Sequence, residues 1–214
     1  FEQARDLSIQ AMRNQLEYVT SSTKTSISHS IAQEGSVIWD DEKFIAVGYN
    51  NTGISTSTDG VTWSFIPSGQ IQGSNQQENF NDILFNKWAV GERGVPEYIA
   101  VGQTGLILTS NDGFNWYKKT GINPQPYKAV AYDGTTYVIV GEAPNSSSGP
   151  SILYSQNTNT WTASNITSIA TGLDLLDIIY NDDYDAFYAV GEGGLIVKST
   201  DSGVTWTKLE GGTT

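Results

Sequence analysis

The chain has 214 residues, of which 38% are hydrophobic and 11% aromatic, so it is long and apolar enough to bury a sizeable core. It carries 11 Lys and Arg against 23 Asp and Glu, a formal net charge of -12. Because clustered cations are needed to bind phosphate backbones and anionic lipids, we expect neither nucleic acid nor a membrane as a partner. Cysteine is absent, which excludes disulfides and Cys-ligated zinc, and no apolar run is long enough for membrane insertion.

Residues 1–22 are predicted to form a short α-helix, because they lack Gly and Pro and are rich in helix-forming residues. Four apolar side chains recur at heptad spacing and define a seam, Ile9, Met12, Leu16 and Val19. Such a seam either pairs with copies of itself, as in a coiled coil that makes a homo-oligomer, or docks on the rest of the protein. The Ser- and Thr-rich stretch 23–36 is predicted to be a linker.

Residues 37–214 contain one sequence unit four times. Each unit is predicted to contain a strand, an Asp/Asn turn, a strand ending in Val-Gly, a Gly turn, a strand ending in Ser, and a turn followed by Trp. Four strands in a unit of roughly 40–50 residues is the signature of a β-propeller blade. The predicted blades span about 37–66, 82–119, 128–163 and 176–209. The Val-Gly strands are continuously apolar, which predicts burial on both faces by neighbouring blades.

The turn before each Trp carries a second recurring pattern. An Asp there accepts backbone N–H bonds, a Gly takes a positive φ, and the Trp adds apolar area to the packing. Since the pattern recurs in every unit, we interpret its Asp residues as turn caps and not as metal ligands or catalytic groups. The third copy has Asn157 in place of Asp. The pattern comprises Ser57, Asp59, Gly60, Trp63, Ser110, Asp112, Gly113, Trp116, Ser155, Trp161, Ser199, Asp201, Gly203 and Trp206.

These four turns resemble the Asp-box, or BNR, repeat of sialidase-like β-propellers, over about residues 37–209. The resemblance implies an all-β fold, a β-propeller with four recognisable four-stranded blades, here preceded by the short N-terminal α-helix. Sialidases bind the substrate carboxylate with three arginines, whereas this chain has only Arg5, Arg13 and Arg93. Two of those lie in the predicted helix, so sialidase activity is not expected.

A candidate ligand face is predicted from the Val-Gly turns, which lie at the same end of every predicted blade. The residues directly after Val-Gly, with a nearby tyrosine, are Tyr49, Gln103, Glu142, Glu192 and Tyr127. Two carboxylates in neighbouring blades could perform glycoside hydrolysis, although solvated turn residues are the simpler interpretation. Amide-rich loops and tyrosines on this face would also suit a host-surface glycan. No cofactor or metal is expected.

The chain also resembles propellers of two functional settings. One is the photosystem II assembly factor family, whose propellers have more blades and a basic arginine patch that this chain lacks. The other is bacteriophage virion proteins of tails, nozzles and fibres. The resemblance to the second setting implies a non-enzymatic structural or adhesion module of a virion, with neighbouring structural proteins and a host-surface glycan or protein as the expected partners. A secreted or periplasmic location is the alternative. A glycosidase-like hydrolase and a cellular protein-binding propeller, such as an assembly factor, remain alternative functions.

Overall fold

The computed structural model describes residues 35–48, 53–66, 70–73, 79–87, 97–119, 124–166, 169 and 171–209. Within these ranges the regular structure consists of β-strands and two short 3-10 turns, and α-helix is absent. The all-β prediction is therefore confirmed for the described part of the chain. The predicted helix 1–22, with its seam of Ile9, Met12, Leu16 and Val19, lies outside the described residues, as does the linker up to residue 34.

Each sequence unit forms one sheet whose strands follow chain order and pair antiparallel. The first sheet contains β1 (Ser36–Trp39), β2 (Phe44–Val47), β3 (Ile54–Ser57) and β4 (Ser64–Phe65). The second contains β6 (Phe80–Phe85), β7 (Tyr98–Gly102), β8 (Ile107–Ser110) and β9 (Trp116–Lys118). The third contains β10 (Tyr127–Tyr132), β11 (Tyr137–Gly141), β12 (Ser151–Ser155) and β13 (Thr162–Ala163). The fourth contains β14 (Leu175–Asn181), β15 (Ala186–Gly191), β16 (Ile196–Ser199) and β17 (Thr207–Lys208).

The segment after the fourth strand of a sheet reaches the outer edge of the next sheet. β5 (Ile71–Gln72) pairs in parallel with β9, so that the second sheet has five strands. Asn165 makes the equivalent parallel bridge to Thr205 beside β17. These two latches, which the sequence did not predict, fasten the first sheet to the second and the third to the fourth.

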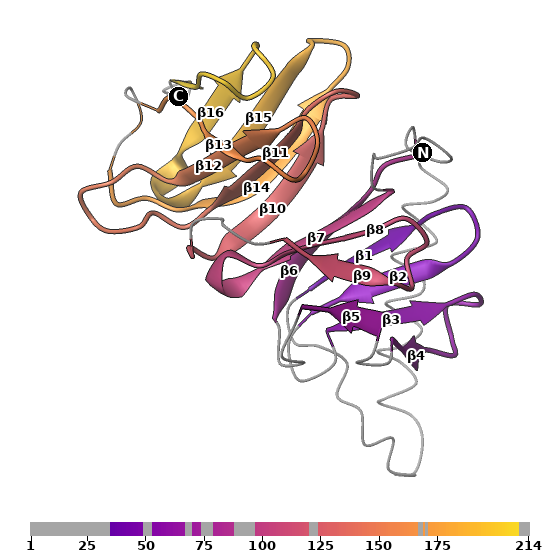
Figure 1. Cartoon of the computed structure of the whole chain (residues 1–214). Helices are drawn as coiled ribbons and strands as arrows, with labels where there is room; N and C mark the ends of the chain where they lie inside the picture. Colours follow the sequence, from indigo (N-terminus) through magenta and orange to yellow (C-terminus); the bar gives the residue numbers. More distant parts are fainter. Residues whose placement is uncertain are drawn as a thin grey trace, which may run out of the picture.

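The sheets pack face to face in chain order and form an arc (Figure 1). The first strand of each sheet lies next to the first strand of the following one, so β1, β6, β10 and β14 succeed each other along the arc. The first two sheets, indigo to magenta, lie at one end of the arc, and the last two, orange to yellow, lie at the other (Figure 1).

Each sheet has an aromatic face and an aliphatic face, because side chains alternate between the two sides of a strand. The aromatic face of one sheet packs on the aliphatic face of the sheet before it, which creates three buried interfaces. The aromatic faces carry Trp39, Phe44 and Trp63; Phe85, Tyr98 and Trp116; Tyr132, Tyr137 and Trp161; and Tyr180, Phe187 and Trp206. The opposite faces, called aliphatic here, carry Ile45, Val47 and Ile54; Ile99, Val101 and Ile107; Val138, Val140 and Ile152; and, in the fourth sheet, Val190 and Ile196 together with the aromatic Tyr188.

The prediction that Val-Gly strands are buried on both faces is correct for the middle sheets and wrong for the fourth. All five residues of β7 and of β11 are buried. In β15, however, Val190 remains 45% exposed. The reason is its position in the arc, since no described sheet packs on the aliphatic face of the fourth sheet.

Candidate functional site

The Val-Gly turns have the same backbone geometry in three consecutive sheets. The amides of Gln103, Glu142 and Glu192 donate to the carbonyls of Asn79, Pro126 and Asp174 at 2.9, 3.0 and 2.9 Å. Each acceptor directly precedes the first strand of its sheet. The three turns therefore lie at one end of the sheets, as the sequence predicted.

The glycine of each Val-Gly turn is required by a close approach of the backbone. A Cβ atom on Gly102, Gly141 or Gly191 would collide with the carbonyl that accepts the neighbouring amide bond. The repeated glycine thus lets β7, β11 and β15 pass directly beside the start of the first strand. The residue after the glycine therefore occupies the same position in each of these sheets.

The side chains at these turns contact each other through neighbours that the sequence did not single out. Glu142 forms a 2.7 Å ion pair with Lys128, which occupies the bulge in β10. Asp174 accepts a 2.8 Å bond from the amide of Ala143 and donates its own amide to Oε2 of Glu192 at 3.3 Å. Asp174 therefore links the turn of the third sheet to the turn of the fourth. The turn surface is defined here as Asn81, Gln103, Lys128, Glu142, Asp174 and Glu192.

The sequence placed two tyrosines on this surface, and the structure describes one of them, Tyr127. Tyr49 lies outside the described residues. Tyr127 is fully buried between the second and third sheets, where Asn81 Nδ2 donates to its backbone carbonyl at 2.5 Å. Burial raises the pKa of Tyr127 well above its ordinary value. Its ring is part of the core and unavailable to a ligand, which corrects the prediction.

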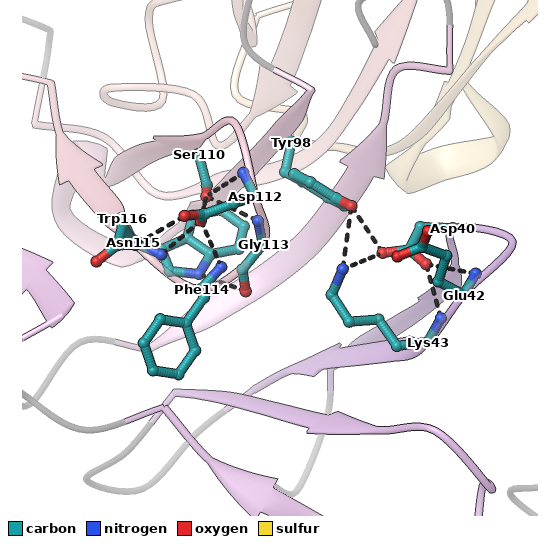
Figure 2. A network of polar contacts seen from close by, with 10 residues as sticks. All are labelled: Asp40, Glu42, Lys43, Tyr98, Ser110, Asp112, Gly113, Phe114, Asn115 and Trp116. Carbon is teal, nitrogen blue, oxygen red and sulfur yellow. Dashed lines mark hydrogen bonds and ion pairs between the residues drawn. The ribbon is translucent and has the colours of Figure 1, made fainter. Parts of the chain in front are cut away.

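The turns before the Trp residues are hydrogen-bonded in the way that the sequence indicated. In the second sheet, Oδ1 of Asp112 accepts from the amides of Phe114 and Asn115 at 2.8 and 2.7 Å. Ser110 Oγ accepts from the Gly113 amide at 2.9 Å, and Trp116 Nε1 donates to the Gly113 carbonyl at 3.2 Å (Figure 2). The third copy keeps this arrangement with Asn157 as the acceptor.

Electrostatics agree with a structural role for these aspartates. The amides of Thr62 and Val61 lower the pKa of Asp59 to about 2. Burial opposes ionisation of Asp112 and Asp201, but hydrogen bonds from Asn115 and from Thr205 outweigh it and hold both pKa values below the ordinary range. A carboxylate that is permanently ionised and engaged by its own turn is a poor general acid. Among the four Trp residues of the pattern, Trp116 and Trp206 are buried, whereas Trp63 and Trp161 stay partly exposed.

At the opposite end of the strands, a buried polar cluster joins the first sheet to the second (Figure 2). Asp40 accepts from the amides of Glu42 and Lys43 at 2.9 and 2.7 Å, and its Oδ2 contacts Tyr98 Oη and Lys43 Nζ, each at 2.7 Å. Burial disfavours the Asp40 carboxylate, but Lys43 and Tyr98 compensate and keep its pKa below the ordinary value. The Asp40 carboxylate is bonded to Glu42, Lys43 and Tyr98, so we interpret the cluster as a structural link between the first two sheets.

Two further properties, metal binding and membrane insertion, concern the described part of the chain. Within it, no group of three or more His, Cys, Asp or Glu side chains is arranged to hold a metal ion. The same residues contain no helix that is long and apolar enough to cross a membrane.

Comparison with known proteins identifies the architecture. Residues 110–214 match the family model described as the DUF6242 beta propeller domain. The fold is that of a β-propeller. The solved structure of YCF48 from Cyanidioschyzon merolae is similar with a TM-score of 0.54 at 15% identity, over 86% of this chain and 59% of its own. YCF48 bound to D1 peptide is similar with a TM-score of 0.56 at 18% identity, over 87% of this chain and 57% of its own. No curated protein sequence matches the chain.

The comparisons bear on the function predicted from the sequence. The chain spans less than two thirds of the length of the YCF48 chains, and at these identities the likeness shows the propeller fold alone. Neither of these two structures is described as a virion or sialidase protein. The virion module and the protein-binding alternative therefore both stay predictions from the sequence.

Proposed function

We propose that this chain is a non-enzymatic β-propeller module that binds a polypeptide segment of a partner protein across the turn surface. The observation that carries the proposal is the similarity to a YCF48 propeller bound to D1 peptide, which extends over 87% of this chain. Peptide binding is a property of that protein. It is proposed for this chain because the chain shares the fold and has a polar, repeated surface at one end of its sheets.

The chemistry of the turn surface indicates what kind of segment would bind. The turn surface contains three carboxylates, those of Glu142, Asp174 and Glu192, and one ammonium, that of Lys128, which is paired with Glu142. The whole chain carries a net charge of -12, which favours encounter with cationic partners. We therefore expect the bound segment to carry Lys or Arg, whose donors fit carboxylate and carbonyl acceptors.

The contacts of Glu142 and Glu192 argue against the hydrolase alternative. A glycosidase needs two carboxyl groups that flank the scissile bond, one to protonate the leaving group and one to act as base or nucleophile. Glu142 is instead paired with Lys128 at 2.7 Å, and Glu192 accepts the amide of Asp174. Both carboxylates hold turn contacts that proton transfer would break.

The virion role stays a prediction from the sequence, as does a location in a virion or in a secreted or periplasmic compartment. Adhesion to a host-surface protein would use the same kind of contact as the proposed function. Protein binding is therefore the part of the sequence-based interpretation that the proposal retains.

The proposal is tested with short fluorescent peptides that share one Gly/Ser/Tyr framework and differ only in bearing Lys and Arg, no charge, or Asp and Glu. Fluorescence anisotropy is expected to show binding of the basic peptide, weakening as salt is added. The paired change Glu142→Gln and Glu192→Gln should weaken it by roughly fivefold or more.

The matched control removes the same number of charges at the other end of the strands, by Asp182→Asn and Asp183→Asn in the exposed turn between β14 and β15. We expect this variant to bind like the parent chain. Equal weakening in both variants would mean that only net charge matters and would contradict a site on the turn surface. Glycoside turnover that disappears in Glu142→Gln would contradict the non-enzymatic assignment.

A further inference from the structure

The aliphatic face of the fourth sheet is uncovered among the described residues. Val190 and Ile196 are 45% and 38% exposed, and Ile179 beside them on β14 is 57% exposed. At the positions of Tyr188, Val190 and Ile196 in the other three sheets, the side chains are between 0% and 3% exposed, namely Ile45, Val47, Ile54, Ile99, Val101, Ile107, Val138, Val140 and Ile152. In each of those sheets the burial comes from the aromatic face of the following sheet.

A polar residue on the same face independently points to a missing sheet. Asp82, in the first strand of the second sheet, accepts the amide of Ile83 at 2.8 Å through Oδ1 and the amide of Val130 at 3.0 Å through Oδ2. Val130 belongs to the first strand of the third sheet, so Asp82 joins two successive sheets. Asp177 has the same place in the fourth sheet, opposite Val190 as Asp82 is opposite Val101.

Asp177 also has the same local conformation, since its Oδ1 accepts the amide of Ile178 at 2.8 Å. By this equivalence its second oxygen lies where the first strand of a further sheet would donate an amide. The bulge residue Leu176, 50% exposed, corresponds to Asn81, whose side chain reaches the carbonyl of Tyr127 in the following sheet. Leu176 cannot donate such a bond, so the fourth sheet shares the aspartate and the apolar face with the second sheet but lacks the Asn81 contact.

The opposite end of the arc carries the complementary surface. The aromatic face of the first sheet contains Trp39 and Trp63, both partly exposed, on either side of Phe44, with ring centroids 4.6 and 6.2 Å from it. The corresponding aromatic side chains of the later sheets are those that cover the preceding aliphatic face. The two ends lie far apart in one chain (Figure 1), so a single copy does not bring them together.

We propose that the aliphatic face of the fourth sheet binds the aromatic face of the first sheet of a second copy of this chain. The contact would repeat the three interfaces inside the chain, with Asp177 accepting an amide from β1 of the partner copy. It is a head-to-tail contact, in which two different surfaces meet, and two copies would close a ring if the angles between sheets add up to a full turn. The proposal is independent of peptide binding, because it uses other residues.

The test measures molar mass by light scattering for the full chain over a range of concentrations. The expected result is a mass of at least twice the monomer that grows with concentration. Val190→Glu, on the aliphatic face, and Val37→Glu, on the aromatic face of the first sheet, should each raise the dissociation constant by about tenfold or more. Phe114→Glu is the matched control, because Phe114 is 44% exposed and belongs to the second sheet, whose two faces are both covered inside the chain. Thermal unfolding of each variant verifies that it is folded.

Mixing the two face variants distinguishes head-to-tail association from the alternatives. Each variant keeps one intact face, so the mixture should associate although neither variant does so alone. A parent chain that stays monomeric would overturn the proposal. The aliphatic face of the fourth sheet would then be assigned to a sheet from another polypeptide. An oligomer that neither face variant weakens would also overturn it, in favour of the seam predicted in residues 1–22. Peptide binding by the variants is a separate readout, so its failure and the failure of this proposal are distinguishable.

Discussion

The hydroxyl of Tyr98 donates a 2.7 Å hydrogen bond to Oδ2 of Asp40, from the second sheet to the first. The next interface has a matching contact, in which Asn86 Nδ2 donates to Tyr137 Oη at 2.7 Å. In both cases the residue directly after the first strand of one sheet bonds the first aromatic residue of the Val-Gly strand in the next. At the third interface this aromatic residue is Phe187, which has no hydroxyl. The repeat therefore uses this tyrosine contact at two of its three interfaces.

Removing the Tyr98 hydroxyl should destabilise the chain. Tyr98→Phe leaves the buried Asp40 carboxylate with one donor fewer, which costs about 1–3 kcal/mol of unfolding free energy. Urea unfolding at pH 7 measures the change, and Tyr184→Phe, at a residue that is 68% exposed, is the control. An equal effect of both changes would show that the Asp40 contact contributes nothing specific.

The same variant should alter stability in acid. The pKa of Asp40 is lowered in the folded chain, so its contribution is present above the unfolded pKa and is lost as the pH falls through the folded value. Without the Tyr98 hydroxyl the folded pKa rises towards the ordinary value. We expect the acid unfolding midpoint of Tyr98→Phe to move to higher pH, as followed by tryptophan fluorescence.

Asp82 should give the opposite dependence on pH. Burial raises its pKa from 3.8 to about 6, although the Val130 amide partly offsets this. Between these values the unfolded chain loses the proton more readily than the folded chain, so this group lowers stability as the pH rises from about 4 to 6. Asp82→Asn should flatten that part of the stability profile, measured by urea unfolding at several pH values. A profile with an unchanged slope would contradict the raised pKa.

A side chain at Gly113 is expected to be destabilising. Its φ is +69°, and a Cβ would lie 2.6 Å from Ile45 Cδ1 in the preceding sheet. Gly113→Ala should therefore cost about 2–3 kcal/mol, by backbone strain and by displacement of a buried side chain. Gly134→Ala measures backbone strain alone, because Gly134 also has a positive φ, +100°, and nothing lies within 4 Å of the added Cβ. Thermal unfolding of the two variants should differ clearly, and equal midpoints would argue against the contact with Ile45.

Asn should replace Asp201 better than Ala does. In the third sheet Asn157 already accepts two amides at 2.9 Å each, so an amide oxygen can cap this turn. Asp201→Asn keeps an acceptor for the Thr205 amide, and its Nδ2 can donate to the Thr205 hydroxyl. Asp201→Ala should cost about 1 kcal/mol in chemical unfolding and Asp201→Asn clearly less. Equal costs for the two changes would mean that the turn needs the negative charge and not just an acceptor.

The sequence predicted the sheets because the repeat encodes each strand and turn in local chemistry. Asp112 and Gly113 determine a turn within a few residues, and alternation determines which side chains share a face. Tyr127 was misplaced because its burial depends on the neighbouring sheet, and not on its own strand. Lys128 and Asp174 were missed for the same reason, since their roles come from contacts between sheets. The exposure of Val190 likewise depends on whether another sheet packs against the fourth one.

The two latches, β5 on β9 and Asn165 beside Thr205, mean that a repeat in the sequence and a sheet in space are offset. Each latch belongs to one repeat and pairs with the outer strand of the next sheet. Separation of two sheets joined in this way would therefore break backbone pairing in one of them. Cooperativity of unfolding should thus be strongest within the first two sheets and within the last two. The same offset makes the arrangement extensible, because a gene that duplicates one repeat adds both a sheet and the segment that fastens it.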